Sequence, residues 1–485
     1  MRIIGMGFLL VSLALPAYAQ NARTAEQAAL GRENHPKVLA KFGGEIGTVE
    51  ITEFVDDLGR ELVRYSDQPR ADWTFTVLDT PVVNAFAVSG GYIYVTRGLL
   101  ALVDDEAELA AVLSHEIGHV TADHLGDRDD ANGDALRNGL LSAVIGGIFS
   151  NGEDRLGNAI KSGVMATFEF IGDFSQQQEL EADRLGIAMM IEAGYDPYAA
   201  ADFLASLSAQ HELEALISGR EYSPNTVAFF ATHPADADRV RDAVREAEQS
   251  GASDHRSRNQ VEYYDLIDGM IYGDVAAQGF VRGRRFMHPT MLFAYEVPEG
   301  FMITNAAQAV RAKGPNGATM VLTGGRAPEA SLTRYIEQGW ARQIGQKQRV
   351  SPLEDMREFE IDGMEAATAI LPISGRNGRI NLRLTVIRRG DTMFRISGGS
   401  REGDDETFDA ILAATQTFRN MDQAEAARMQ PYRIEIRRAG RRDTVEKLAE
   451  EMPFATLNEE RFRTLNGLDD DEEIERGDYV KMIVE

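Results

Sequence analysis

The sequence predicts a multidomain α+β protein. A mainly helical first part with a small sheet precedes an α+β domain, and a small βααβ domain ends the chain. Length is the first reason, because 485 residues are too many for one domain of about 150 residues. The second reason is that helical patterns give way to alternating strand patterns near residue 255. The third is the strand–helix–helix–strand order of residues 430–485.

Composition limits the kind of protein. Hydrophobic residues make up 44% of the chain, which is enough to build cores. The net charge of −27 repels phosphate backbones, so nucleic acid is excluded as a partner. The chain has no cysteine, so it forms no disulfide, and any metal ion must be bound by His, Asp or Glu.

The N-terminus predicts a secretory signal at residues 1–19. An apolar run follows Arg2, Pro16 breaks it, and Ala17-Tyr18-Ala19 provides the small residues that a signal peptidase recognises. The run is too short to span a bilayer comfortably. We therefore expect cleavage after Ala19, with an uncleaved membrane anchor as the alternative.

The first domain, residues 20–255, carries the candidate metal site. Strands are predicted in TFTVLD, VVNAFAV and GGYIYVTR, and a helix through DDEAELAAVLSHEIGHV. His115, Glu116 and His119 in this helix fit the pattern H-E-x-x-H. Residues four apart share a face, so both imidazoles can reach one Zn²⁺ while Glu116 points beside it towards a water molecule. Two structural histidines are the alternative.

A catalytic zinc ion needs a third protein ligand and an open fourth position. Glu179 and Asp183 lie four apart in a helical segment, so Glu179 fits as the ligand and Asp183 as a residue that orients a ligand imidazole. Asp123 and His124 are rivals by proximity. His124 lies five residues past His119 and is rotated off the face of the motif, so we discount it. Spacing alone leaves the third ligand open.

HEIGH followed by ELEAD resembles the HExxH…ExxxD signature of metallopeptidase family forty-eight, which includes CAAX prenyl endopeptidases, HtpX membrane proteases and the periplasmic BepA type. The likeness extends upstream through NAFAVSGGYIYVTRGLL and downstream to Thr232-His233-Pro234, with Arg239 following. It covers about residues 30–250. The resemblance implies a mainly helical gluzincin fold with a small sheet and one zinc ion per chain.

The resemblance also implies a role for each motif residue: zinc ligation by His115, His119 and Glu179, proton transfer by Glu116, and orientation of a ligand by Asp183. His233 matches the family's His-Pro position. We expect it to donate a hydrogen bond to the oxyanion or to be a fourth zinc ligand at rest. The alternative is a histidine at the start of a helix, with Pro234 in the first helical position.

The segment Asn84-Ala85-Phe86 is expected at a sheet edge along the cleft, where an extended substrate pairs with the backbone. Such pairing tolerates many sequences and predicts cleavage of unfolded polypeptides; a turn-side role for Asn84 is the alternative. The apolar, glycine-rich residues 139–150 are expected to form a mobile lid or a hairpin in peripheral membrane contact. A buried helix is the alternative there.

The trailing domains carry no catalytic motif. Residues 430–485 resemble a LysM carbohydrate-binding module, with RIEIRR, RDTVEKLAEEM, FRTLNGL and GDYVKMIV in βααβ order and a turn at Asn466-Gly467-Leu468. Arg442 and Arg476 replace the usual Gly and Pro, which weakens the predicted binding of peptidoglycan. Residues 256–425 faintly resemble PsbP/Mog1-like α+β domains, and we expect His288 there to be structural.

We therefore predict a secreted, periplasmic zinc metalloendopeptidase that cleaves unfolded, misassembled or envelope proteins in protein quality control. One alternative is an envelope chaperone or scaffold that keeps a zinc fold, which the intact Glu116 argues against. The other is a peptidoglycan-associated hydrolase, whose usual metal motifs differ from HExxH…ExxxD.

Overall fold

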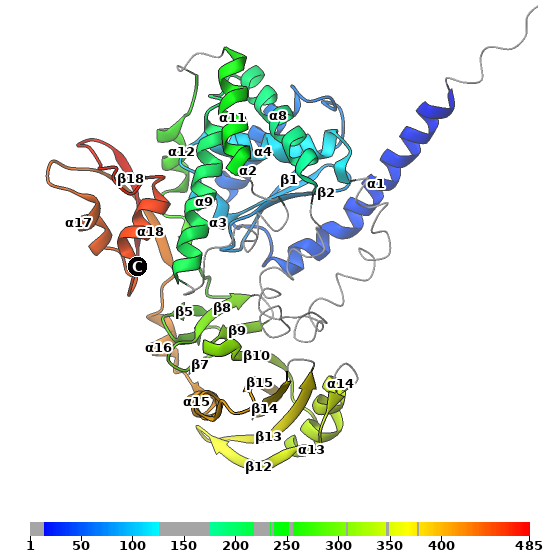
Figure 1. Ribbon diagram of the computed structural model, residues 1–485, viewed down its shortest axis with the longest axis vertical. Coiled ribbons are helices and arrows are strands. Elements are labelled where there is room, and N and C mark those ends of the chain that lie inside the picture. The colour runs from blue at the N-terminus through cyan, green and yellow to red at the C-terminus, as the bar shows by residue number, and fades with distance from the viewer. Residues whose placement is uncertain are drawn as a thin grey trace, which may run out of the picture.

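A computed structural model describes residues 14–125, 174–217, 233, 237–251, 256–306, 309–345, 349–375 and 378–485. Helices dominate the N-terminal part, and sheets dominate most of the chain that follows, which confirms the α+β class. Figure 1 shows the helical part above the sheet-rich middle part, with the C-terminal elements beside the helices.

The described N-terminal part contains a three-stranded sheet. β1 (Thr74–Leu78) and β3 (Tyr92–Thr96) pair in parallel, and β2 (Ala85–Val88) pairs antiparallel with β3. These strands lie in the three segments predicted from the sequence. The helices are α1 (Ala14–Lys41), α2 (Val49–Val63), α3 (Arg97–Leu102), α4 (Glu106–Thr121), α8 (Gln176–Ala193), α9 (Ala199–Ile217) and α11 (Ala237–Ser250).

Alternation of side chains gives this sheet two apolar faces. Ala85 and Ala87 of β2 belong to the main core, which also contains the apolar residues of α4. Phe86 and Tyr94 point to the other face and pack with Val38 of α1 and with Phe42, which follows this helix. The rings of Phe86 and Tyr94 stack with centroids 5.0 Å apart. The sheet is therefore held between α4 and α1.

Two glycines let α4 and α8 approach closely. A Cβ atom on Gly118 of α4 would lie 3.0 Å from the carbonyl oxygen of Ala182 in α8. A Cβ atom on Gly186 of α8 would lie 3.1 Å from the backbone nitrogen of His115 in α4. Because both contacts are with backbone atoms, neither glycine can gain a side chain without separating the helices.

In its described residues, the middle part is built on an eight-stranded antiparallel sheet of order β11-β13-β14-β15-β10-β9-β8, with β12 paired to β13. Apolar side chains fill both faces, one with α15 and the other with α13 and α14. The elements are β8 (Met302–Ala306), β9 (Ala309–Lys313), β10 (Thr319–Arg326), α13 (Leu332–Tyr335), α14 (Ala341–Gly345), β11 (Arg349–Val350), β12 (Glu354–Ile361), β13 (Met364–Gly375), β14 (Gly378–Arg389), β15 (Thr392–Arg401) and α15 (Asp405–Thr415).

A smaller sheet of order β16-β7-β6-β5 completes the middle part. His288 in it is buried, and its Nδ1 accepts a hydrogen bond from the backbone nitrogen of Met291, which fits the expected structural role. The elements are β5 (Phe280–Arg282), β6 (Arg285–His288), β7 (Phe293–Glu296), β16 (Arg419–Asn420) and the short helix α16 (Gln423–Ala427).

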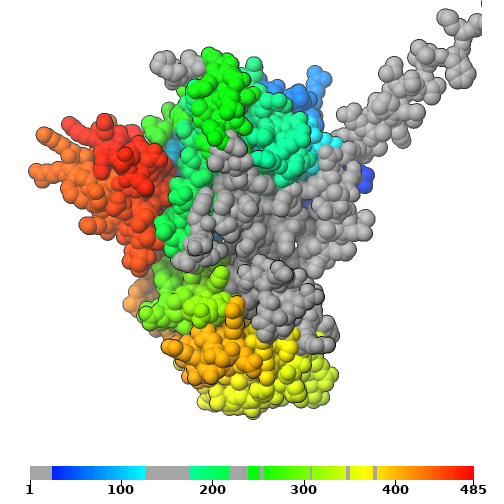
Figure 2. Space-filling view, viewed as in Figure 1, coloured from blue at the N-terminus to red at the C-terminus, as the bar shows by residue number. Residues whose placement is uncertain are grey.

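The C-terminal elements share a core with the N-terminal part. β17 (Tyr432–Arg438), α17 (Val445–Glu450), α18 (Asn458–Leu465) and β18 (Tyr479–Val484) follow the predicted βααβ order, while the likeness to LysM stays a prediction. Their apolar residues, such as Phe462 and Met482, belong to the same cluster as those of α3 and α4. Figure 2 shows the C-terminal part (red) directly against the helices of the N-terminal part (green).

Helix α12 (Gln260–Ile267) joins this shared core through Tyr263, Tyr264 and Ile267. The hydroxyl of Tyr263 donates a hydrogen bond to the carbonyl oxygen of Leu100 at 2.6 Å. β4 (Ile271–Tyr272) pairs with β17. The sequence places residues 256–272 in the middle domain, whereas these contacts tie them to the N-terminal and C-terminal parts.

The predicted signal and the predicted hairpin fall largely outside the description. Residues 1–13 and 139–150 do not lie among the described residues. α1 begins at Ala14 and continues through the predicted cleavage position after Ala19. Among the helices that are described, none has both the length and the apolar character that a membrane crossing requires.

Candidate metal centre

Helix α4 carries the motif histidines on one face. It begins where the side chain of Asp105 accepts a hydrogen bond from the backbone nitrogen of Glu108 at 2.9 Å, the usual device that starts a helix. His115 and His119, one turn apart, are both buried. Their Nε2 atoms lie 3.0 Å from each other, as the predicted sharing of one metal ion requires.

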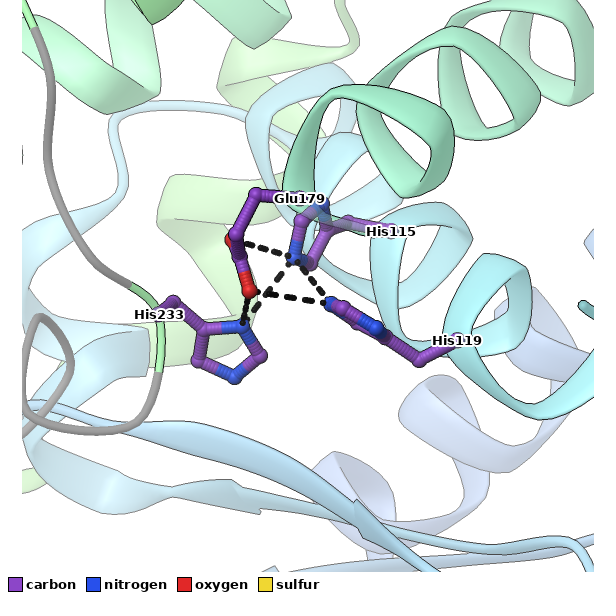
Figure 3. A group of neighbouring side chains, drawn as sticks. All are labelled: His115, His119, Glu179 and His233. Carbon is purple, nitrogen blue, oxygen red and sulfur yellow. Dashed lines mark hydrogen bonds and ion pairs between the residues drawn. The ribbon is translucent and has the colours of Figure 1, made fainter. Parts of the chain in front are cut away.

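Glu179 reaches the two histidines from α8, whose start is fixed by a reciprocal capping box between Ser175 and Gln178. One of its oxygens lies 3.4 Å from His119 Nε2 and the other 3.5 Å from His115 Nε2. Figure 3 shows the Glu179 carboxylate beside the imidazoles of His115 and His119, with the His233 ring below it.

His233 completes the group. Its Nδ1 lies 3.0 Å from Glu179 Oε1 and 3.2 Å from His115 Nε2. One ligand atom from each of His115, His119, Glu179 and His233 can be chosen so that all four lie within 4.8 Å of one another. The structure thus brings together two residues of α4, one residue of α8, and His233, which lies between α9 and α11 in the sequence.

The four side chains fit a zinc ion. Zinc in proteins accepts imidazole nitrogen and carboxylate oxygen in tetrahedral arrangements. Glu116 is also fully buried beside this group, and its Oε1 lies 3.3 Å from His233 Nε2. Its Oε2 has no hydrogen-bond partner among the described residues. A buried carboxylate oxygen without a partner is costly unless a ligand or water satisfies it.

Arg239 of α11 ties the two carboxylates of α8 together. Its guanidinium lies 2.9 Å from Glu179 Oε2 and donates two hydrogen bonds of 2.8 Å to Asp183. Burial alone would raise the pKa of Glu179, but the facing His233 and Arg239 hold it well below its usual range. For Asp183, burial is likewise outweighed, by Arg239 and by a hydrogen bond from His115, so the pKa is lowered. Both groups are therefore ionised.

The two motif histidines differ in their surroundings. Burial lowers the pKa of His119 well below its usual range, which keeps its imidazole neutral, the form that binds metals. Burial acts in the same direction on His115, but the hydrogen bond to Asp183 raises its pKa overall. His115 Nδ1 lies 2.8 Å from Asp183 Oδ1. Asp183 thus contacts the ring nitrogen of His115 that does not face His119 and Glu179.

The structure includes two residues that the sequence reasoning did not assign to the site. Arg239 was noted only as part of the resemblance, although two ionised carboxylates four residues apart on a buried helix face require a cation. His124 was discounted, yet it is buried with its Nδ1 3.0 Å from His119 Nδ1. No pattern in the sequence signals this second contact, because it depends on how the chain turns after α4.

The residues predicted to contact substrate lie on and before β2. The backbone of Asn84 exchanges hydrogen bonds with the hydroxyl of Thr96, at 3.0 and 2.8 Å. The side-chain amide of Asn84 is fully buried, and neither of its polar atoms has a partner in the described part of the chain. Ala85 and Phe86 are also fully buried. Phe86 packs under α1, so its side chain is directed away from α4.

The chain is similar to known metallopeptidases. Residues 52–247 match the model described as Peptidase family M48, a range that contains α4, α8 and His233. The chain is 26% identical over 421 residues to the Beta-barrel assembly-enhancing protease of Escherichia coli (strain K12), covering 81% of this chain and 77% of that relative. It is 33% identical over 201 residues to the protein of that name from Yersinia pestis, covering 41% and 39%.

More distant similarities also occur. The chain is 25% identical over 214 residues to Mitochondrial metalloendopeptidase OMA1 of Schizosaccharomyces pombe, covering 44% of this chain and 58% of that relative. Among solved structures, PsbP (CyanoP) from Synechocystis sp. PCC 6803 aligns with 30% of this chain and 98% of its own, at 12% identity and a TM-score of 0.25. Saccharomyces cerevisiae Mog1p aligns with 29% of this chain and 96% of its own, at 11% identity and a TM-score of 0.24. TM-scores this low do not establish a shared fold, so the PsbP/Mog1-like character of residues 256–425 stays a prediction.

Proposed function

Since the chain belongs to peptidase family M48 and is a zinc metalloendopeptidase, we propose that Glu116 is the general base of its peptide cleavage. The zinc ligands that we assign are His115, His119 and Glu179. The observation that carries the assignment is the convergence of their ligand atoms, with that of His233, within 4.8 Å. Zinc held there would polarise the scissile carbonyl and acidify water.

Glu116 moves the proton in this proposal. Its Oε2 is buried without a partner among the described residues, so it is free to accept a proton from the attacking water. The water oxygen forms a bond with the carbonyl carbon, and the peptide C–N bond breaks. Glu116 returns the proton to the nitrogen of the leaving amine, so the carboxylate ends in the state in which it began.

Asp183 and Arg239 prepare the ligands. Asp183 accepts a hydrogen bond from His115 Nδ1, which leaves Nε2 of that ring with the lone pair that binds metal. Arg239 helps to keep Glu179 and Asp183 ionised through its contacts with both carboxylates. Because a protonated carboxyl is a poor zinc ligand, this pairing favours metal binding before any substrate is present.

His233 is proposed as the fourth zinc ligand of a resting state. A catalytic zinc ion needs one position open to water, whereas Nδ1 of His233 occupies the fourth place in the group. Cleavage then requires that His233 leave this place. We therefore expect His233→Ala to raise the rate of protein cleavage while zinc remains bound. A fall in the rate would instead favour the alternative role, in which His233 stabilises the oxyanion.

Polypeptide backbone is the proposed binding partner of β2. In the described sheet β2 has a neighbour on one side, β3, so a substrate strand could pair with its other edge. Such pairing is independent of side chains and suits unfolded polypeptides. Asn84 directly precedes β2, and its buried amide has no hydrogen-bond partner among the described residues; a substrate peptide group would supply one. Because β2 is buried, its edge must become exposed first.

The proposed substrates are unfolded or misassembled proteins of the cell envelope, and the proposed location is the periplasm. Support comes from the predicted signal at residues 1–19 and from similarity to proteases named for enhancing β-barrel assembly. Proposed peptidoglycan binding by residues 430–485 has less support, because Asn466 of the predicted turn uses its side chain within that domain. Its amide donates to the carbonyl oxygens of Phe462 and Lys481.

The test uses purified residues 20–485 with casein as an unfolded substrate. Glu116→Gln is expected to bind one zinc ion per chain and to cleave at least about 100-fold more slowly, because general base catalysis contributes that much. Glu262→Gln on the exposed face of α12 is the control and is expected to cleave normally. Unchanged cleavage by the Glu116 variant would refute the mechanism. Release of soluble fragments from purified peptidoglycan by the wild-type chain would favour the hydrolase alternative.

A further inference from the structure

We propose that His124 is a positioning residue of the zinc site, which orients the ligand His119 through a hydrogen bond and is itself oriented by Glu181. This proposal rests on the zinc assignment above and adds residues outside the ligand group. His124 is 4% exposed, and its Nδ1 lies 3.0 Å from His119 Nδ1. Its Nε2 lies 3.5 Å from Glu181 Oε2 on α8.

The end of α4 brings His124 back to the site. On a continuous helix a residue five positions past His119 would point away from the metal. The helix ends at Thr121, however, and Asp123 adopts a left-handed conformation with φ of 61°. That conformation is unusual for a residue with a Cβ atom. Gln27 of α1 donates a hydrogen bond of 2.8 Å to Asp123 Oδ1 and so helps to hold the turn.

The hydrogen-bond directions follow from the metal site. His119 presents Nε2 to His115 and Glu179, so Nε2 must carry the lone pair that binds zinc. The proton of a neutral imidazole then sits on Nδ1, which donates to His124 Nδ1. His124 must accept at that atom and therefore carries its own proton on Nε2, directed to Glu181. One assignment of protons satisfies all three side chains.

The arrangement parallels the support of the other ligand histidine. His115 Nδ1 donates to Asp183, whereas His119 Nδ1 donates to His124, which in turn meets a carboxylate of the same helix α8. Each ligand ring is thus fixed in the tautomer that binds zinc, once directly and once through an intervening imidazole. Residues that fix metal ligands in this way typically contribute 10–100-fold to metal affinity.

Phe174 shields this contact from water. Its ring stacks on His119 with centroids 3.8 Å apart and an angle of 19°. It also lies 6.3 Å from the ring of His124. A hydrogen bond in such a dry environment is stronger than one in water, and losing its acceptor is correspondingly more costly. Because His119 is fully buried and His124 is 4% exposed, water has little access to the Nδ1 proton in place of His124.

Two variants of similar size separate the hydrogen bond from packing. In His124→Asn the side-chain oxygen can take the place of Nδ1 as acceptor, whereas His124→Leu offers no acceptor. Zinc affinity is measured by competition with a chelating dye, and Co²⁺ substitution gives an absorption spectrum that reports ligand geometry. We expect His124→Leu to weaken zinc binding 10–100-fold and to alter the Co²⁺ spectrum. His124→Asn should stay within about 5-fold of the wild type.

The outcomes separate this proposal from the zinc assignment. Equal affinity of His124→Leu and the wild type refutes the positioning role, and so does an equal loss in the Leu and Asn variants, which would indicate packing. Should the Leu variant fail to fold, His124→Phe retains a ring without an acceptor and is expected to show the same loss. His288→Phe in the middle part is the control and should bind zinc normally. A wild-type chain that binds no zinc would refute the proposed function instead.

Discussion

Replacing Lys481 by methionine tests whether the C-terminal part is a structural component of the zinc-binding part. Lys481 lies on β18 and is fully buried. Its ammonium donates to the carbonyl oxygens of Ala101, Leu102 and Val103 at 3.1, 2.8 and 3.0 Å. It also lies 2.9 Å from Asp104 Oδ1. A single side chain therefore satisfies the end of α3 and the carboxylate of Asp104, which is 13% exposed and lies just before α4.

The expected loss of stability follows from these partners. The last carbonyl groups of a helix have no partners within it, so Lys481→Met leaves them and Asp104 without a cation. Breaking a buried ion pair by removing one partner typically costs about 3–5 kcal/mol. Two effects place the loss near the lower end. Tyr264 still donates to Asp104 at 3.2 Å, and Glu108, whose pKa is raised well above its usual range by burial and by Asp104, can take up a proton.

Thermal unfolding of the zinc-free chain measures this loss. A destabilisation of about 3 kcal/mol lowers the melting temperature of a unit of 150–250 residues by roughly 6–12 °C. Lys447→Met in the same C-terminal part is the matched control, because Lys447 is exposed and donates to one carbonyl oxygen, that of Arg442. We expect the control to shift the melting temperature by less than about 1 °C. Equal shifts in the two variants would refute the reasoning.

Two further predictions concern helix packing and pH. Gly118→Ala should destabilise the chain by about 1–3 kcal/mol, because the added carbon meets the backbone of Ala182. Thermal melts measure the loss. Gly339→Ala is the control, because the nearest atom to its added carbon is a ring atom of Tyr335 at 3.7 Å. Burial lowers the pKa of His211 to about 4, below the usual value of about 6.5. The neutral form is therefore favoured in the fold, so the stability that this residue contributes is complete above about pH 6.5 and is lost as the pH falls towards 4. His211→Phe should lose less melting temperature than the wild type as the pH falls from about 6.5 towards 4. Parallel curves of melting temperature against pH for the variant and the wild type would contradict this prediction.

The parts of the site that lie within helices could be predicted from the sequence. The four-residue spacing of His115 and His119, and of Glu179 and Asp183, fixes which side chains share a face, because helix geometry is the same in every protein. In the structure His115, His119 and Glu179 converge, and Asp183 contacts His115; their metal-binding roles stay a prediction. The strands at 74–96 were predictable for the same reason, since alternation and β-branched residues act locally.

The parts of the site and fold that depend on a single backbone angle or on distant packing could not be predicted from the sequence. His124 reaches His119 because Asp123 adopts a positive φ, and spacing counts along a helix fail at its end. Arg239 of α11 contacts Asp183 of α8, and no local sequence pattern indicates that these two helices lie side by side. The position of the C-terminal part was also unpredictable. Apolar residues such as Met482 indicate that a face is buried, but they do not show which element packs against that face.

Helix α4 is held at both ends by residues remote in the sequence. At its start, Arg258 donates to the capping carboxylate of Asp105 at 2.9 Å, next to the residues that Lys481 binds. At its end, Gln27 of α1 holds Asp123. A helix of this length is stiff, so fixing both ends fixes the rotation and axial position of His115 and His119 relative to α8. Metal and catalytic sites require placement within about 0.5 Å. The C-terminal part therefore bears on the alignment of the proposed zinc site without a contact to its four residues among the described parts of the chain, and its loss is expected to affect zinc affinity as well as stability.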